Sequence, residues 1–459
     1  MKIFQFLFVS VVSALAGVCL LGLVPILMKS KLLLVAIPFL YFFVLVAINH
    51  PISVMYMIIY SRVMLEPLLN MSRTDVGGIN IGLGALLNIM VLAYTVFTCL
   101  TVKANALREM FVRWWVVYLF LVFLSITYCP QKTFAFRMWL NVFSYFAMGL
   151  LPFYLIKSLE SRNRWLKHLL YASILPIVFA NIDLLRGGAV DWSGMRVMGT
   201  FPHPNMLGFY LVLMIVVVFL MMNSSRIELS GKLKVFLRFY IINLFVLLLF
   251  TKTRNAWLAC WFAFFLYGVF KDKRYLFFTV CLPPLMLLVP EFAYRITELI
   301  QGDYVAGGSG NQLNSWAWRV NLWKDAMVWI MNNPFMGYGF TAFKFYSVEF
   351  SKMAVAGGSG AHNVYVEILF ETGLFGLVAY CSIYVALIGS FLKRLRDAVS
   401  FCPKESAILL SYIISYALVC FADNMLYYLV LNWFVWFFIG CMLVPVTNTD
   451  KPKPVTQES

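Results

Sequence analysis

Charged side chains are scarce in this sequence. Asp, Glu, Lys and Arg make up 12% of its 459 residues, whereas 62% of the residues are hydrophobic. Soluble domains carry roughly twice that charged fraction. The composition therefore excludes an ordinary soluble globule and indicates a polytopic membrane protein.

Patterns of disulfide, metal and nucleotide sites are also missing. The nine cysteines lie mostly in apolar runs and show no pairing pattern, so no disulfide framework is expected. No His and Cys spacing resembles a zinc site, and neither a metal nor another cofactor is predicted. The run Val305–Gly310 recurs as Val355–Gly360, but neither copy follows a strand or carries a P-loop lysine. We interpret the two copies as hinges of a lid.

Apolar runs of membrane-spanning length are abundant. A bilayer needs about 20 apolar residues per helix, and twelve to fourteen such runs can be placed along the chain. They predict an all-α integral membrane protein. The runs begin near residues 6, 32, 52, 79, 113, 136, 168, 204, 236, 255, 275, 363, 407 and 426.

Basic residues set the expected topology. The chain has 36 Lys and Arg against 20 Asp and Glu, and the basic residues gather in every second connection. By the positive-inside rule these connections are cytoplasmic, and Lys2, Lys451 and Lys453 place both termini there. Topology thus accounts for much of the net charge of +16, so no nucleic-acid partner is predicted.

This topology divides the chain into four parts. Residues 1–290 carry eleven spans and a short outer segment at 184–203, and residues 291–362 form a large outer loop, the lid. Residues 363–446 hold the C-terminal spans, and 447–459 form a disordered cytoplasmic tail. An outer connection of about 70 residues is far longer than most, which points to function.

The first outer segment ends in a proline-flanked histidine. Pro202 and Pro204 restrict the backbone around His203, and Pro204 with Asn205 suits a helix start. One interpretation is a rigid turn leading back into the membrane. The other adds that Arg196 and His203 face a site and donate hydrogen bonds to an anion there.

Two further arginines lie at the same membrane level. Arg254, in the turn before a span, cannot be deprotonated and needs a counter-anion or a lipid headgroup. Thr253 is expected to cap the helix that follows. An amphipathic helix from Ser315 to Asn332 places Arg319 on its aromatic face, where the cation needs an anion or a ring. Packing between Trp316 and Trp323 is the simpler interpretation of that face.

His362 is the candidate for proton transfer. A single histidine is more often structural, but this one precedes a span that carries Asn363, Glu367 and Glu371 on one face. An imidazole with a pKa near neutrality is suited to take a proton from a sugar hydroxyl.

These motifs resemble those of the O-antigen ligase and Wzy-type polymerase superfamily, membrane glycosyltransferases of bacterial surface polysaccharide assembly. His362, Asn363, Gly373 and Gly376 fit its signature of His, then Asn, Ser or Gln, nine residues, Gly, two residues, and then Gly, Thr or Tyr. The turn from Thr251 to Arg254 resembles a Thr-x-Ser-Arg element, with Thr253 in place of Ser. The segment 199–205 is similar to an element of polymerase-like members.

The resemblance implies a GT-C-like fold in the bacterial inner membrane, with its active site on the periplasmic face. The donor would be an undecaprenyl-diphosphate-linked glycan, the acceptor a second glycan, and the reaction independent of metal. A flippase and a chain-length regulator are candidate partners. His362 would act as general base; Arg254, Arg319 and Arg196 would bind the diphosphate; His203, Asn205, Asn363 and Glu367 would support them.

Three functions stay open. A polymerase would join lipid-linked repeat units, and the element around His203 favours it. A ligase would transfer the glycan to the lipid A core. A flippase or transporter of lipid-linked sugars would predict repeated halves with broken helices in both, which the sequence lacks.

Overall fold

The computed structural model describes residues 46, 49–71, 73–76, 79–104, 106–191, 194–286, 303–304, 312–313, 315–397 and 401–446. The spans predicted from near residues 6 and 32, the first glycine-rich run and the tail 447–459 lie outside the described residues.

The described chain is predominantly α-helical. Every span predicted from residue 52 onward coincides with a helix, so the prediction of an all-α polytopic membrane protein is confirmed. The helices are α3 (Pro51–Met64), α4 (Glu66–Met71), α5 (Leu83–Thr101), η1 (Ala106–Arg108), α6 (Met110–Ser125), α7 (Lys132–Leu150), α8 (Pro152–Leu155), α9 (Leu159–Leu185), α10 (Pro204–Asn223), α11 (Gly231–Phe250), α12 (Arg254–Phe270), α13 (Lys273–Met286), α15 (Ser315–Asn332), α16 (Ala342–Phe350), α17 (Val364–Arg396), α18 (Pro403–Val419), η2 (Met425–Tyr427) and α19 (Leu429–Leu443).

Within the described residues, five helices are long and apolar enough to cross a membrane: α7 with α8, α9, α10, α11 and α17. Shorter apolar helices cover Ile52–Met64, Leu87–Thr101, Met110–Ser125 and Leu429–Leu443. The total number of spans therefore stays a prediction.

Short antiparallel hairpins interrupt the helices. In the second, Ala189 pairs with Arg196, which ends the hairpin just before the turn into α10. The second and third hairpins fall in the segments predicted to be outer. The strands are β1 (Arg73–Val76) with β2 (Ile79–Gly82), β3 (Ala189–Asp191) with β4 (Gly194–Arg196), and β5 (Asp303–Tyr304) with β6 (Gln312–Leu313).

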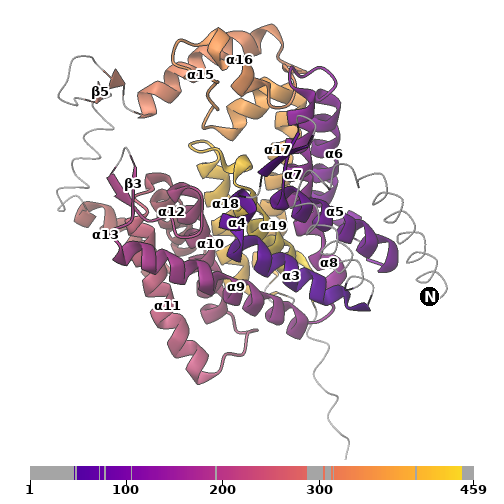
Figure 1. Ribbon diagram of the computed structural model, residues 1–459. Helices are drawn as coiled ribbons and strands as arrows, with labels where there is room; N and C mark the ends of the chain where they lie inside the picture. The colour runs from indigo at the N-terminus through magenta and orange to yellow at the C-terminus, as the bar shows by residue number, and fades with distance from the viewer. Residues whose placement is uncertain are drawn as a thin grey trace, which may run out of the picture.

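Helices α10 and α19 form the centre of the bundle. Every side chain of α10 from Met206 to Met221 is buried, so protein rather than lipid surrounds it, chiefly α9, α11, α12, α18 and α19. Helix α19 crosses α7 very closely (Figure 1). A Cβ atom on Gly440 would lie 2.4 Å from the carbonyl oxygen of Gly149, so only glycine permits this approach.

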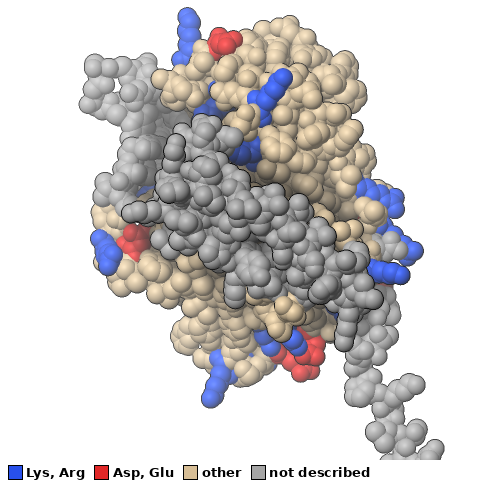
Figure 2. Space-filling view, turned by 45° about the vertical axis from the view of Figure 1, so that its right-hand side comes forward, with Lys and Arg blue, Asp and Glu red and all other residues tan. Residues whose placement is uncertain are grey.

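Helices α15 and α16 form a layer across one end of this bundle (Figure 1). Leu322, Ala326 and Ile330 of α15 are buried against Phe343 of α16 and Phe370 of α17. The amphipathic helix predicted from Ser315 to Asn332 is confirmed with those bounds. Figure 2 shows few charged side chains on one face of the molecule, most of them near its margins.

A buried ion pair joins two helix ends that the sequence predicts to be cytoplasmic. Arg162 of α9 donates from Nη1 and Nη2 to the two carboxylate oxygens of Glu405 in α18, at 3.0 and 2.9 Å. The hydroxyl of Ser224, just after α10, donates to the same carboxylate. Both charged side chains are almost fully buried, so each depends on the other for its counter-charge.

Removing Glu405 should therefore destabilise the fold. Glu405→Ala leaves the Arg162 cation buried without its partner, which typically costs about 3–5 kcal/mol. The thermal unfolding midpoint of the purified protein in detergent measures the effect. Glu160→Ala is the matched control, because Glu160 and Arg164 form an exposed pair at 2.9 Å that contributes little. Equal shifts for the two variants would contradict the assigned role.

Candidate active site

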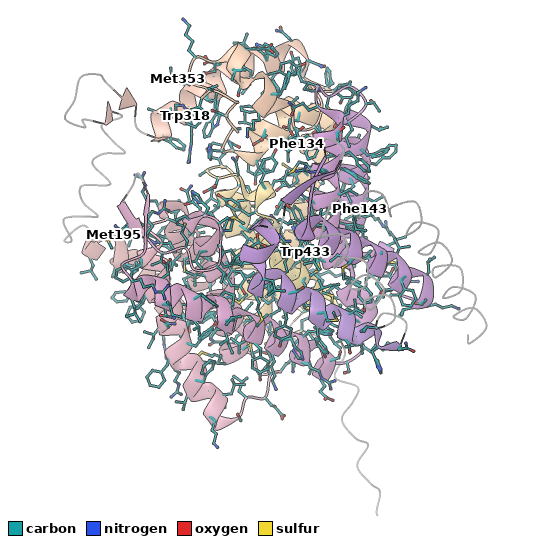
Figure 3. The ribbon with its side chains drawn as sticks, in the orientation of Figure 1. Phe134, Phe143, Met195, Trp318, Met353 and Trp433 are labelled. Atoms are coloured by element: carbon teal, nitrogen blue, oxygen red, sulfur yellow. The ribbon has the colours of Figure 1, made fainter. Side chains whose placement is uncertain are left out.

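Four chain segments meet where α10, α12, α17 and α18 approach α15: residues 196–205, 251–255, 361–363 and 420–428. Backbone hydrogen bonds of these segments and of the residues directly beside them join the segments in pairs. The amide of Val197 donates to the carbonyl of Phe250 at 3.2 Å, and that of Val364 donates to Cys420 at 2.8 Å. Figure 3 shows Trp318 of α15 on one side of this region and Met195 of β4 on the other.

Arg196 ties the first segment to the second. It is buried, and its Nε atom donates to the carbonyl of Thr251 at 2.8 Å. Its Nη2 atom donates to Asn205 Oδ1 at 2.9 Å and to Thr253 Oγ1 at 3.0 Å. The guanidinium thus holds the start of α10 against the turn before α12, a structural role that sequence reasoning did not assign to it.

His203 occupies the N-cap of α10. Its Nδ1 atom accepts a hydrogen bond from the amide of Asn205 at 3.1 Å, and Pro204 is the first helical residue. The helix start predicted at Pro204 is confirmed. The His203 side chain is exposed, so its ring lies at the surface of the site.

The turn between α11 and α12 places Arg254 and Asn255 beside the site. Thr253 occupies the N-cap position, but its hydroxyl makes no capping hydrogen bond to α12, so that prediction is wrong. Instead, Thr253 Oγ1 lies 3.3 Å from Asn205 Oδ1 and accepts from Arg196. Hydrogen bonds with Arg196 and Asn205 therefore replace the capping hydrogen bond of this hydroxyl. Arg254, one residue on, is half-buried.

Helix α15 lies over the other two segments, 361–363 and 420–428, and two of its side chains donate hydrogen bonds to them. Arg319 Nη1 donates to the carbonyl of Ala422 at 2.7 Å, and Trp323 Nε1 donates to that of Ala361 at 2.7 Å. Trp316 packs edge-on against Trp323 with ring centroids 5.6 Å apart, as predicted for this face. The packing interpretation is therefore confirmed, whereas the need of Arg319 for an anion or a ring stays a prediction.

His362 lies in a strained turn before α17. Its φ of +50° falls in the left-handed region, which costs a non-glycine residue on the order of 1–2 kcal/mol. Asn363, not His362, is the N-cap, and its Oδ1 accepts from the amides of Tyr365 and Val366 at 3.0 and 3.2 Å. The other non-glycine residues with positive φ in the described chain, Lys252 and Thr341, also lie in loops around this region.

The second glycine-rich run leads directly into this turn. The amide of Ser359 donates to Ser347 Oγ of α16 at 2.8 Å, and a Cβ on Gly358 would lie 2.0 Å from the carbonyl oxygen of Lys344. The run is therefore packed against α16 in this conformation. Its role as a hinge stays a prediction.

Asp423 is the common acceptor of the site, and sequence reasoning missed it. It is 1% exposed, and Tyr428 OH donates to its Oδ1 at 2.7 Å. Asn205 Nδ2 and Asn255 Nδ2 approach its Oδ2 at 3.3 and 3.4 Å. The available signal was a carboxylate in a two-residue polar turn between apolar helices at the level of the arginines.

Charges of these segments act on one another. Burial lowers the pKa of His362 below its ordinary value, Arg319 and His203 lower it further, and Asp423 opposes them. Burial also lowers the pKa of Arg319; Asp423 opposes this effect, and Arg254 adds to it. The fold therefore brings Asp423 within reach of the charges of Arg319 and His362, with Arg254 near Arg319 and His203 near His362.

Several buried polar atoms here have no hydrogen-bond partner within the described residues. They are Arg319 Nε, His362 Nδ1, Asn363 Nδ2, Glu367 Oε2 and Asn424 Oδ1. Each such atom costs about 1–3 kcal/mol if nothing satisfies it. The set contains donors and acceptors, so it suits water or a ligand that carries hydroxyl groups. Among the described side chains, no cluster of three or more His, Cys, Asp and Glu could hold a metal ion.

Glu367 and Glu371 continue from this site along α17, as predicted, and both are buried. Each contacts a segment that lies outside α17. Tyr427 OH of η2 donates to Glu367 Oε1 at 2.8 Å, and the amide of Phe343 in α16 donates to Glu371 Oε1 at 3.3 Å. The two carboxyl groups thus join α17 to the loops that cover it.

Gly373 breaks α17 one turn further on. Its φ of +65° and ψ of −167° are not helical. The amides of Tyr338 and Gly339 reach the carbonyls of Phe370 and Glu371 at 2.9 and 2.8 Å, so the loop after α15 satisfies carbonyl groups beside the kink. A Cβ on Gly373 would lie 2.1 Å from the carbonyl oxygen of Phe335. This signature glycine therefore serves packing of the loop on α17.

Gly373→Ala should destabilise the protein by more than about 1 kcal/mol, because the added methyl group meets backbone atoms and the residue keeps a positive φ. The unfolding midpoint in detergent measures this. Gly389→Ala lies in the same helix with no atom within 4 Å of the added Cβ. That control should be neutral or slightly stabilising. Similar midpoints for both variants would rule out the packing role.

Comparison with known families identifies the central part of this region. Residues 239–381 match the family model Wzy_C, described as O-antigen ligase. The match runs from α11 through Arg254, Arg319 and His362 to residue 381, past the kink of α17, and it leaves out segment 196–205 and Asp423. No curated protein matches the chain. Residues 239–381 of this membrane protein are therefore similar to the O-antigen ligase family.

Proposed function

We propose that this protein transfers a glycan from a polyprenyl-diphosphate carrier to a hydroxyl group of a second glycan at the outer face of the membrane. One observation carries the proposal: within the matched domain, a strained and partly buried His362 lies close enough to Arg319 for their charges to interact, and Arg319 lies equally within reach of the charge of Arg254. An imidazole base next to two permanent cations suits the removal of a proton and the departure of a diphosphate.

The reaction balances without another reactant. A ring nitrogen of His362 takes the proton of the acceptor hydroxyl, whose oxygen forms a bond to the anomeric carbon of the donor. The bond from that carbon to the carrier phosphate breaks, and its electron pair leaves with the polyprenyl diphosphate. Attack opposite the leaving group inverts the anomeric carbon.

The lowered pKa of His362 suits this role. Because burial and Arg319 disfavour the imidazolium, the lowered pKa favours the neutral ring, which is the form that can take up a proton. Its buried Nδ1 atom has no partner among the described residues.

Arg254 and Arg319 are proposed to bind the diphosphate. Arg319 Nη1 donates to the carbonyl of Ala422, whereas its Nε atom has no hydrogen-bond partner among the described residues. Loss of one such donor in a shielded site typically costs about 10²–10³ in kcat. Arg196 is proposed to act through position, since its hydrogen bonds to Thr251, Asn205 and Thr253 hold the neighbouring turn.

We assign the acceptor to a second lipid-linked repeat unit, which makes the protein a polymerase of bacterial surface polysaccharide. The element Gly199–Asn205 supports this assignment, since its exposed His203 is close enough to His362 to affect its charge. The second candidate is a ligase that transfers the glycan to the lipid A core, which the description of the matched family favours. In both cases we place the protein in the bacterial inner membrane, with both termini cytoplasmic and the site periplasmic.

The glycans that accumulate in a deletion strain test the function. We expect single lipid-linked repeat units at the periplasmic face, and the same species when only His362→Ala is expressed at normal levels. Long chains that stay on the carrier would establish the ligase instead. Precursors retained on the cytoplasmic face would indicate a flippase, and normal polysaccharide with His362→Ala would remove the base assignment.

Arg254→Lys tests the diphosphate site. Lysine keeps the charge but loses the bidentate guanidinium fork, so we expect the rate of glycan transfer to fall at least about tenfold. Arg186→Lys changes an exposed arginine at the end of α9 and should leave the rate unchanged. Full activity of Arg254→Lys would assign this arginine to lipid headgroups.

A further inference from the structure

Four aromatic side chains lie beside the candidate base. The ring of Trp318 is 5.9 Å from that of His362 and meets it edge-on. Trp323 lies 5.6 Å from Trp316 and 5.5 Å from Phe421, also in edge-on contacts. Three of the four come from α15, whereas Phe421 comes from the turn after α18. Figure 3 shows Trp318 at the N-terminal end of α15, at the margin of the outer layer.

These rings are held in place yet remain accessible. Trp323 Nε1 donates to the carbonyl of Ala361, the neighbour of His362, at 2.7 Å, and Trp318 Nε1 donates to Met353 at 2.7 Å. Trp316 and Phe421 stay 41% and 47% exposed. The fold therefore leaves large aromatic surfaces accessible next to its most polar region. Burying these rings against each other would lower the free energy of the fold more.

The neighbouring polar atoms indicate what covers these surfaces. Asn363 Nδ2, Asn424 Oδ1 and Arg319 Nε are buried without described partners in the same segments. A polyprenyl or acyl chain would cover the rings but leave these atoms unsatisfied. A sugar ring has an apolar face of C–H groups and hydroxyl groups around its edge, so it matches both features.

We propose that Trp316, Trp323 and Phe421 form a stacking subsite for the acceptor glycan, next to the sugar whose hydroxyl faces His362. Trp323 is the fixed floor of the subsite, and Trp316 and Phe421 are its exposed sides. The subsite accounts for the aromatic face of α15 beyond packing. This inference rests on the proposed glycosyl transfer.

Binding of the free oligosaccharide tests the subsite apart from catalysis. The probe is the repeat unit released by mild acid from the lipid-linked precursors of a deletion strain, titrated against the purified protein in nanodiscs. Trp316→Ala and Phe421→Ala should each raise the dissociation constant about threefold to tenfold, because a stacking partner contributes about that factor. Trp316→Tyr and Phe421→Tyr should restore most of the affinity.

Phe335→Ala is the matched control. Phe335 is 55% exposed in the loop after α15, but it contacts Phe375 of α17, with ring centroids 5.9 Å apart, rather than the His362 turn. The affinity of the Phe335→Ala variant for the oligosaccharide should equal that of the unchanged protein. Equal loss in all three alanine variants, or no loss in any, would overturn the subsite. Weaker binding of only the lipid-linked form would assign the rings to the polyprenyl chain and overturn it as well.

Kinetics distinguish the subsite from the proposed function. Trp316→Ala should raise KM for the acceptor and change kcat by less than about twofold, as expected for loss of uniform binding. His362→Ala should abolish turnover but keep the stacking contribution, so its dissociation constant for the free oligosaccharide should rise less than that of Trp316→Ala. If His362→Ala kept its turnover, the catalytic assignment would fail while the binding result stood. If Trp316→Ala lowered kcat with KM unchanged, the subsite alone would fail.

Discussion

The need to satisfy a buried carboxylate among cations organises the end of the bundle that α15 covers. Asp423 is almost fully buried, and it is held by Tyr428 and approached by Asn205 and Asn255, while Arg319 lies close enough to interact with its charge. A charge removed from water needs such partners. Because they come from α10, α12, α15 and the loop before α19, one acidic group fixes how four segments of the chain approach one another.

This arrangement leaves the site electropositive and incompletely satisfied. Two cations, Arg254 and Arg319, are balanced by the single carboxylate of Asp423. Buried donor and acceptor atoms near His362 have no hydrogen-bond partner among the described residues. A purely structural cluster would be expected to pair its buried polar atoms. The unmet hydrogen bonds, the left-handed backbone of His362 and the exposed rings of Trp316 and Phe421 all occur in one region. Their coincidence is what favours a ligand with phosphate and hydroxyl groups.

The glycines of the signature have a different task from its histidine. Gly373 interrupts α17 so that the loop after α15 can hydrogen-bond carbonyls beside the break, and the layer of α15 and α16 rests on that contact. Helix α15 in turn carries Arg319 and Trp323 to the His362 and Asp423 segments. The signature thus links a residue proposed for chemistry with the backbone geometry that brings the covering helix over it.

Sequence alone determined the all-α membrane fold, the start of α10 at Pro204 and the bounds of α15, because hydropathy, proline and periodicity act over one or two helical turns. It also selected His362, Arg254 and Arg319, since ionisable groups at membrane depth are rare. Only the tertiary structure revealed Asp423 as the shared acceptor, engaged Arg196 in internal hydrogen bonds and diverted Thr253 from capping α12. The reason is that these contacts join distant parts of the chain, as Arg319 and Ala422 do across 103 positions, and no local pattern specifies which buried polar groups will meet.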